Sequence, residues 1–244
     1  MEKARLDKII AGEGTYSRRE VRLLVRQGRV LVDGVPARSP EDKVVPEAVE
    51  IMVDGTVLHC RRYTWIMLHK PAGVLSATED GRGATVLDLL PPELRRRGLF
   101  PVGRLDKDTE GLLLLTNDGE LAQRLMHPRH HQPKTYDVLV RGTVPAAALA
   151  TMRRGMTLAE GEALRPVEVE SRMQANGHTR LRMVLHQGVN RQIRRMCRDL
   201  GLTILRLKRI RLGPLGLGDL PPGSCRFLSG TEVAALFQAA EIRR

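Results

Sequence analysis

Cysteine and aromatic residues are scarce in this sequence, which has three Cys, three Tyr, three Phe and one Trp among its 244 residues. The cysteines, Cys60, Cys197 and Cys225, lie far apart and form no CxxC pair. This spacing argues against a disulfide framework and against a cysteine-based zinc site. Such cysteine usage is typical of a protein that works in a reducing compartment.

The sequence also lacks any apolar run of the roughly 18 residues that a membrane span requires. Its first residues, Met1 to Arg5, are largely charged and do not show the apolar segment of a secretory signal peptide. Hydrophobic residues nevertheless make up 42% of the chain, which is enough for a buried core. We therefore expect a cytoplasmic, monomeric protein without a membrane partner.

Acidic residues are few relative to basic ones, and the formal net charge is +12. The excess is concentrated in residues 141–244, which carry 18 Lys and Arg against 8 Asp and Glu. An excess of basic residues indicates which kind of partner a protein binds, and it says little about the fold. Nucleic acid is the first partner to consider for such a charge.

The first 55 residues show the pattern of a small αβ module. Leu6, Ile9 and Ile10 have helical spacing, and Ser17 is a favourable N-cap for a second helix. The pair Asp33-Gly34 predicts a hairpin turn between short strands. The second helix is expected to expose a basic face formed by Arg18, Arg19, Arg22, Arg26 and, at its end, Arg29.

Two interpretations of this basic face remain open. It is either a solvated helix surface or a contact for an anionic partner. Like charges three or four residues apart on a helix repel by roughly 0.2–0.5 kcal/mol per pair. A face of four or five arginines with almost no acids is therefore better explained by an anionic partner.

Residues 56–64 are predicted to form a linker, and a larger unit is expected over residues 65–244. The expected strands and helices do not follow the regular βαβ alternation of a parallel sheet, so the fold class is α+β. Strands are expected at residues 65–69, 112–116, 135–141, 167–170, 179–186 and 203–207, and helices at residues 119–126, 146–153, 191–200 and 231–241.

The most informative block is a polar loop that runs from Gly103 to Gly111 and leads into the apolar run Leu112 to Leu115. Asp106 lies in this loop beside Arg104. Polar groups held at the mouth of a buried strand are typical of functional sites. From the loop alone, Asp106 is a nucleophile, a general base, a metal ligand or a structural partner of Arg104. The nearby acids Asp108 and Glu110 keep a magnesium site open.

Three further blocks carry candidate residues. Lys70 opens a Pro-Gly turn after a strand. Lys134 and Tyr136 begin another strand, where a tyrosine can stack on a base or be an ordinary core residue. The run Asn190 to Met196 follows a glycine turn, with Asn190 as a candidate helix cap and its arginines at helical spacing. The loop His127 to His131 is a weaker candidate, and we read it as a surface or RNA contact rather than a metal site.

Taken together, these blocks resemble the ribosomal RNA pseudouridine synthases, in the branch named for the synthase that acts on small-subunit RNA. The resemblance covers nearly the whole chain, and the loop containing Asp106 carries the most specific signature. It implies a small RNA-binding domain of the ribosomal-protein type over residues 1–55. It also implies a catalytic domain over residues 65–244, built on a mixed, largely antiparallel sheet with flanking helices.

The resemblance also implies an activity, which is the isomerisation of a specific uridine in ribosomal RNA to pseudouridine without a cofactor or a metal. Asp106 matches the nucleophile, which attacks either ribose C1′ or base C6. Tyr136 matches the tyrosine that stacks on the uracil and takes part in removing the C5 proton, and Arg194 matches the partner of the aspartate. Further substrate contacts are expected from Arg104, Lys70, Lys134, Asn190, Arg191 and Arg195, and RNA contacts from the arginines of the N-terminal module.

The target RNA is less clearly indicated. The loop before Lys134 is similar to members acting on small-subunit RNA, whereas the run Asn190 to Cys197 is similar to members acting on large-subunit RNA. The second block is longer and favours large-subunit RNA, either free or in an assembly particle. Two other classes fit part of the pattern. One is a non-catalytic RNA-binding assembly factor, and the other is a metal-dependent nuclease using Asp106, Asp108 and Glu110.

Overall fold

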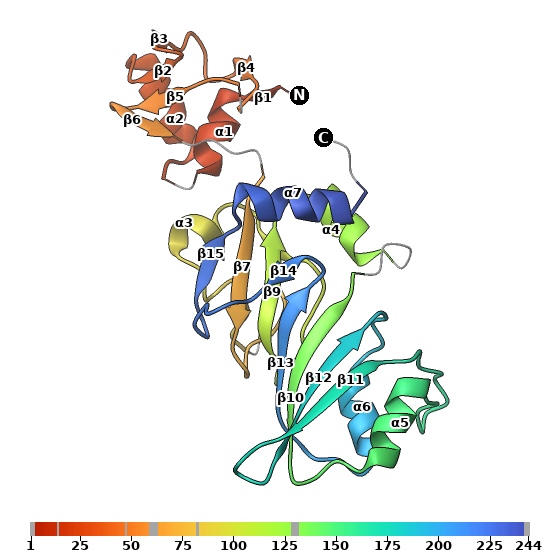
Figure 1. The fold of residues 1–244 in the computed structure, drawn as a ribbon. Coiled ribbons are helices and arrows are strands. Elements are labelled where there is room, and N and C mark those ends of the chain that lie inside the picture. The colour runs from red at the N-terminus through yellow and green to blue at the C-terminus, as the bar shows by residue number, and fades with distance from the viewer. Residues whose placement is uncertain are drawn as a thin grey trace. The chain divides into compact units, whose positions relative to one another are not determined.

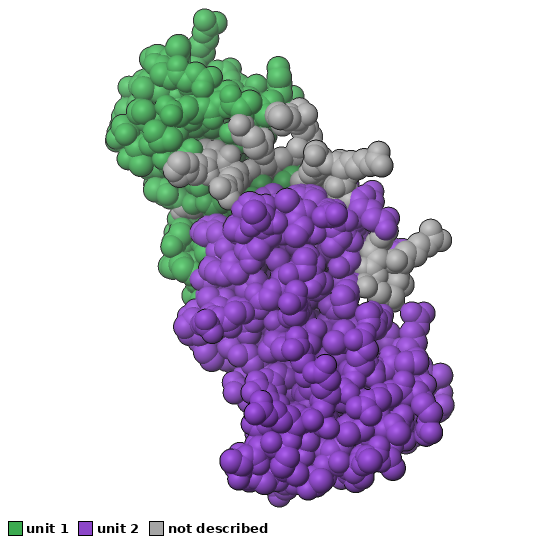
Figure 2. Space-filling view, viewed as in Figure 1, with its two compact units in different colours: residues 1–64, 87–100, 116–118 green, residues 65–86, 101–115, 119–244 purple. Residues whose placement is uncertain are grey.

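The computed structural model of the chain describes residues 3–13, 15–46, 48–58, 63–81, 83–127 and 132–241 (Figure 1). The chain divides into two compact units (Figure 2). The first comprises residues 1–64, 87–100 and 116–118, and the second comprises residues 65–86, 101–115 and 119–244. Within the described ranges, no helix is both long and apolar enough to cross a membrane.

In the first unit, α1 and α2 pack on a small sheet. Apolar side chains from both helices and from β2 and β5 form one core, which includes Leu6, Ile10, Val21 and Ile51. The four-stranded sheet has the order β3-β2-β5-β6, and β1 pairs with β4. The elements are β1 (Ala4–Arg5), α1 (Leu6–Gly12), α2 (Arg18–Arg26), β2 (Val30–Val32), β3 (Val35–Pro36), β4 (Lys43–Val44), β5 (Ile51–Val53), β6 (Thr56–Leu58) and α3 (Pro92–Arg95).

The helix cap and the hairpin turn predicted for this unit are both present. Ser17 caps α2 in a capping box, in which its Oγ accepts from the Glu20 amide at 3.3 Å. Asp33 and Gly34 have φ values of 50° and 76°, as the type I′ hairpin requires at both positions. One local prediction is wrong, because Thr56–Leu58 in the predicted linker pair with β5 as a strand. Residues 59–62 of that segment lie outside the described residues.

The second unit is built on a large mixed sheet of order β11-β12-β10-β13-β9-β7-β15. The pairs β10–β12, β10–β13, β11–β12 and β15–β7 are antiparallel, and β13–β9 is parallel. The predicted α+β class is confirmed. The elements are β7 (Trp65–Lys70), β8 (Phe100–Pro101), β9 (Glu110–Thr116), α4 (Gly119–Met126), β10 (Lys134–Val140), α5 (Ala146–Arg154), β11 (Glu168–Met173), β12 (Thr179–Leu185), α6 (Gln192–Asp199), β13 (Ile204–Leu212), β14 (Leu215–Gly216), β15 (Cys225–Phe227) and α7 (Gly230–Ala239).

Helices α5 and α6 cover one face of the β10–β13 part of this sheet (Figure 1). Their apolar residues, such as Met152 and Met196, pack with strand residues such as Val138 and Leu181, all of them fully buried. Side chains alternate between the two faces of a strand, and this alternation explains the buried–exposed pattern of β12. Tyr136 packs against the edge of the same cluster.

A parallel junction of only two residue pairs joins β9 to β13, namely Glu110 with Lys208 and Gly111 with Arg209. Gly111 has a φ of 109°, and a Cβ there would lie 2.2 Å from the carbonyl oxygen of Arg209. Only glycine therefore allows the two backbones to come this close. The loop that contains Asp106 leads directly into this junction.

Candidate active site

Asp106 lies in a tight turn between β8 and β9. The turn opens at Gly103, whose φ of 74° suits glycine, and its backbone closes where the Thr109 amide donates to the Asp106 carbonyl oxygen at 3.0 Å. The Asp106 side chain keeps 27% of its surface exposed. A fixed carboxylate thus faces an accessible space.

Two side chains hold the loop on either side of Asp106, the half-buried Ser76 and the buried Lys70. Ser76 Oγ donates to the Leu105 carbonyl oxygen at 2.8 Å and accepts from the Leu105 amide at 3.1 Å. Lys70 Nζ donates to the carbonyl oxygens of Lys107 at 3.0 Å and Thr109 at 2.9 Å. These hydrogen bonds hold the loop backbone on both sides of Asp106 and therefore fix the position of its carboxylate. Support of this kind makes a functional site rigid. Nothing in the sequence pattern around Ser76 indicates this role.

The position of Lys70 corrects the prediction that it contacts substrate. Its side chain is fully buried, and Nζ donates a third hydrogen bond to the Pro71 carbonyl oxygen at 2.9 Å. All three N–H groups of the ammonium are thus used inside the protein. Burial lowers the pKa of Lys70 to about 8, although the charges of Asp108 and Asp106 oppose this shift.

The activity is expected to fall as the pH rises through about 8, the pKa of Lys70. A neutral amine has only two donors for three carbonyl oxygens, so the loop loses a hydrogen bond. The folded protein then releases a proton that the unfolded chain keeps up to about pH 10.5. The free energy of unfolding should therefore gain a contribution that grows with pH in this window.

Single-turnover rates and urea unfolding between pH 6 and 10 would measure both effects. The Lys134→Arg variant is the control, because burial also lowers the pKa of Lys134. If the alkaline fall disappears in that variant, the titrating group is Lys134 and the Lys70 prediction is wrong.

Arg194 of α6 reaches the Asp106 loop. Its Nε lies 3.8 Å from Asp106 Oδ2, and its Nη2 donates to the Asp108 carbonyl oxygen at 2.8 Å and to Thr109 Oγ1 at 3.2 Å. The guanidinium is thus fixed beside the carboxylate, with opposite charges facing each other. The helix begins one residue later than predicted. Its N-cap is Arg191, with a φ of 49° and no side-chain cap, so the expected cap at Asn190 is wrong.

Tyr136 lies on β10 next to a register shift between Thr135 and Tyr136 in the pairing with β13. Such bulges re-aim side chains and are common beside active sites. Tyr136 is half-buried. It lines the same cavity as Asp106 and Arg194, which has a volume of about 520 Å³. Four of the predicted substrate-binding residues also line this cavity: Arg104, Lys134, Asn190 and Arg191.

Arg195 departs from the prediction. Its guanidinium forms ion pairs with Glu160, at 2.9 Å, and with Glu162, and it does not line the cavity. The next turn of α6 continues this network, since Arg198 pairs with Glu160 at 2.7 Å. Arg195 therefore anchors α6 to the segment before β11, and it is not available to substrate in this arrangement.

The acids near Asp106 are not gathered for a metal. Glu110 points away into an ion pair with Arg206 at 2.7 Å. Among the residues that the structure describes, no group of three or more His, Cys, Asp or Glu side chains forms a potential metal site. The histidines His130 and His131 lie outside the described residues.

Comparison with known families decides the identity. A model described as RNA pseudouridylate synthase matches residues 64–199, and an S4 domain model matches residues 4–49. The chain belongs to the RNA pseudouridine synthases. In this synthase the matched region contains Asp106, Tyr136 and Arg194.

Relatives and a solved structure agree with this assignment. The chain is 40% identical over 233 residues to an uncharacterised RNA pseudouridine synthase of Bacillus subtilis, covering 95% of this chain and 98% of that protein. It is 37% identical to the ribosomal large subunit pseudouridine synthase B of the same species, covering 97% of both chains. A crystal structure of a pseudouridylate synthase superposes with a TM-score of 0.65 at 29% identity, covering 95% of this chain and 99% of the other.

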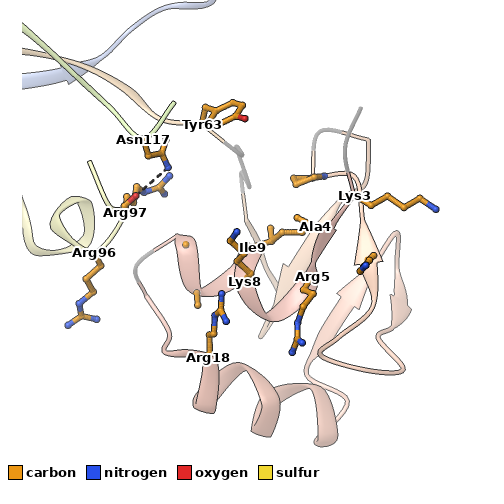
Figure 3. A pocket seen from close by; sticks show the side chains of 14 residues that line it. Lys3, Ala4, Arg5, Lys8, Ile9, Arg18, Tyr63, Arg96, Arg97 and Asn117 are labelled. Atoms are coloured by element: carbon orange, nitrogen blue, oxygen red, sulfur yellow. Dashed lines mark hydrogen bonds between the residues drawn. The ribbon is translucent and has the colours of Figure 1, made fainter. Parts of the chain in front are cut away.

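The synthase has a second, basic cavity of about 720 Å³ in its first unit (Figure 3). Its lining includes Lys8 and Arg18 from the two helices of the S4 domain. Arg97 also lines this cavity, but its guanidinium is engaged by Glu13 and donates to Thr64 Oγ1 at 3.0 Å. All five predicted arginines of the S4 domain are exposed. Arg29 forms an ion pair with Asp54 at 2.6 Å. Of the five arginines it is therefore the least available to bind RNA.

Proposed function

We propose that this synthase converts a specific uridine of ribosomal RNA to pseudouridine, and that the target lies in large-subunit RNA. The observation that carries the chemistry is the joint placement of Asp106, Tyr136 and Arg194 around one cavity. The preference for large-subunit RNA is supported by the block Asn190 to Cys197 and by the relative whose name specifies that subunit.

Asp106 is proposed as the nucleophile, attacking either ribose C1′ or base C6. The N-glycosidic bond breaks, the uracil rotates, and a carbon–carbon bond forms between C1′ and C5. A carboxylate is a competent nucleophile at a sugar carbon. Arg194 orients that carboxylate, while Tyr136 stacks on the uracil and assists removal of the C5 proton.

The target nucleotide must leave its stack to enter the cavity, which costs a few kcal/mol. Arg104 is exposed at the rim beside Asp106, and we assign it a contact with the displaced RNA. Lys134, Asn190 and Arg191 line the same cavity and are assigned to the flanking nucleotides. Phosphate contacts of this kind offset part of the cost of flipping.

Residues 1–55 are proposed as a separate RNA-binding domain and residues 65–244 as the catalytic domain. In the full chain, Arg19→Gln with Arg26→Gln should weaken RNA binding and lower its salt slope by about 2, because each phosphate contact contributes about one unit. The matched control is Arg172→Gln with Arg182→Gln, two exposed arginines of β11 and β12. An equal change in both double variants would mean that binding follows net charge and not this domain.

A chelator should leave the reaction unchanged to within about twofold once magnesium's effect on RNA folding is matched, because the proposed chemistry uses a carboxylate and no metal. The RNA product should keep its length and mass. Liquid chromatography with mass detection of the treated transcript measures both. Shortened RNA, or loss of activity in EDTA with prefolded RNA, would favour the nuclease class instead.

The experiment that tests the function is pseudouridine mapping by carbodiimide labelling and primer extension. Ribosomal RNA from cells with and without the gene is compared, and the deleted strain is complemented with wild type or with Asp106→Asn. One stop in large-subunit RNA should disappear with the gene and return only with wild type. If no ribosomal position changes, the ribosomal RNA assignment is wrong.

A further inference from the structure

Arg209 is a buried cation in the wall of the catalytic cavity that none of the roles above uses. It lies on β13, which pairs with β10 (Figure 1), and it is directly opposite Tyr136 in that pairing. Directly opposed residues in an antiparallel pair project to the same face of the sheet. Arg209 lines the cavity together with Tyr136 and Asp106, yet only 2% of its surface is exposed.

One part of the Arg209 guanidinium has a structural partner. Nε donates to the Leu112 carbonyl oxygen at 2.8 Å. The last backbone pair between β9 and β13 is Gly111 with Arg209. Leu112 is the next residue of β9, so the Arg209 side chain satisfies the carbonyl oxygen that follows the end of this pairing. A neutral side-chain donor would serve this purpose equally well.

The other part of the guanidinium is unsatisfied. Nη2 is buried and has no hydrogen-bond partner among the described residues, and no ion pair found in that part of the chain joins Arg209 to a carboxylate. A buried donor without a partner carries a desolvation penalty and calls for an explanation. Among the residues that the structure describes, Asp106 is the only acid that lines the cavity, and that carboxylate is already beside Arg194.

The positive charge of Arg209 affects another ionisable group that lines the cavity. Lys134, a neighbour in the same lining, has a pKa lowered by burial and then by the positive charge of Arg209. An anionic or strongly polar group placed between these cations and Tyr136 would be stabilised. Uracil carries two carbonyl oxygens, and each is a hydrogen-bond acceptor that suits such donors.

We propose that Arg209 donates a hydrogen bond from Nη2 to a carbonyl oxygen of the flipped uracil and stabilises the negative charge that the base acquires. This role rests on the proposed reaction at Asp106. When the C1′–N1 bond breaks, its electron pair stays on the uracil and spreads over N1 and the carbonyl oxygens. When C5 bonds to C1′, the bond that Asp106 formed to the nucleotide breaks and frees the carboxylate. The C5 proton then passes to the solvent and N1 takes up one proton, so no oxidant or reductant is needed. Fixed donors at a site of developing charge lower the barrier.

The test uses the full chain and a large-subunit ribosomal RNA transcript under single turnover with enzyme in excess. Arg209→Gln retains a donor for Leu112 but removes the charge, and it should slow conversion by about 100-fold. RNA affinity should stay within about threefold, because the missing interaction is made mainly in the transition state. The control is Arg153→Gln, since Arg153 Nη2 donates at 2.8 Å to the Val169 carbonyl oxygen away from the cavity.

A second readout separates charge stabilisation from a structural role. Fluorine at C5 stabilises the uracil anion, so a transcript made with 5-fluorouridine depends less on Arg209 for bond cleavage. The deficit of Arg209→Gln, measured as consumption of the target nucleoside, should shrink by about tenfold on that transcript. A merely structural defect would slow both transcripts equally and lower the unfolding temperature, and that result would overturn the inference. If Arg209→Gln does not fold, Arg209→Lys, which keeps the charge but loses the planar pair of Nη donors, should show a smaller deficit that again shrinks on the 5-fluorouridine transcript; equal slowing of both transcripts would overturn the inference.

Asp106→Asn in the same assay separates this inference from the proposed function. If Asp106→Asn is inactive and Arg209→Gln matches wild type on both transcripts, Arg209 has no such role and the nucleophile stands. If Asp106→Asn keeps its rate, or if the wild-type chain converts no uridine of the transcript, the proposed function fails and this inference fails with it.

Discussion

Asp106→Asn is expected to abolish pseudouridine formation, by about 10⁴-fold or more, as the loss of a covalent nucleophile does in other enzymes. The amide has nearly the shape of the carboxylate but does not form the covalent bond to the nucleotide. The loop should keep its conformation, because Ser76 and Lys70 hold its backbone and not the Asp106 side chain. RNA affinity should stay within about threefold. The measurements are single-turnover conversion and RNA binding on the same preparation.

Asp108→Asn is the matched control for this experiment. Asp108 is two residues away in the same loop, and Arg194 binds its backbone carbonyl oxygen, which the substitution leaves in place. Its activity should remain within about threefold of wild type. If the two variants lose activity equally, the loop acts through its total negative charge and Asp106 is not a specific nucleophile.

Gly111→Ala is expected to destabilise the fold by about 3–5 kcal/mol, because strain at a positive φ and overpacking act together. The added Cβ would lie 2.2 Å from the carbonyl oxygen and 2.6 Å from the nitrogen of Arg209. These are backbone atoms of a central strand and have no other rotamer to adopt. The β9–β13 junction would have to separate, moving the Asp106 loop away from Arg209 and Tyr136. Urea unfolding gives the change in free energy.

Gly161→Ala separates the two causes of that loss. Gly161 has a comparable φ of 90°, but a Cβ there meets nothing within 4 Å. It should cost only about 1–2 kcal/mol, the backbone strain alone. Equal losses in the two variants would show that the close approach of β9 and β13 contributes nothing to stability.

Local sequence signals predict the elements well where short-range physics decides them. Helix α4 has the predicted bounds Gly119–Met126, and the Ser17 capping box and the Asp33-Gly34 turn are present as expected. Caps and turns depend on residues within a few positions of one another, so a single sequence contains the required information. The strand at Thr56–Leu58 was missed, because a three-residue strand is stabilised by its partner β5 and hardly at all by its own composition.

The sequence does not show which charged side chains are buried or paired inside the protein. The sequence predicts a substrate contact for Lys70, but the side chain is buried and all three of its donors are satisfied within the protein. Arg195 looked equivalent to its neighbour Arg194, but Glu160 and Glu162 engage it. Adjacent residues on a helix point about 100° apart, so only one of the two faces the cavity.

The family of this protein is predictable from sequence, because the loop from Gly103 to Gly111 and the blocks around Tyr136 and Arg194 are contiguous motifs. The sequence also determined the basic balance that favours an RNA partner. The tertiary structure alone decided which cations reach the cavity. Strand pairing and helix packing bring Arg209 and Arg194 to the cavity that contains Asp106, about 100 residues earlier in the chain, and Arg194 lies beside its carboxylate. Such long-range contacts depend on packing and register, which short-range sequence patterns do not encode.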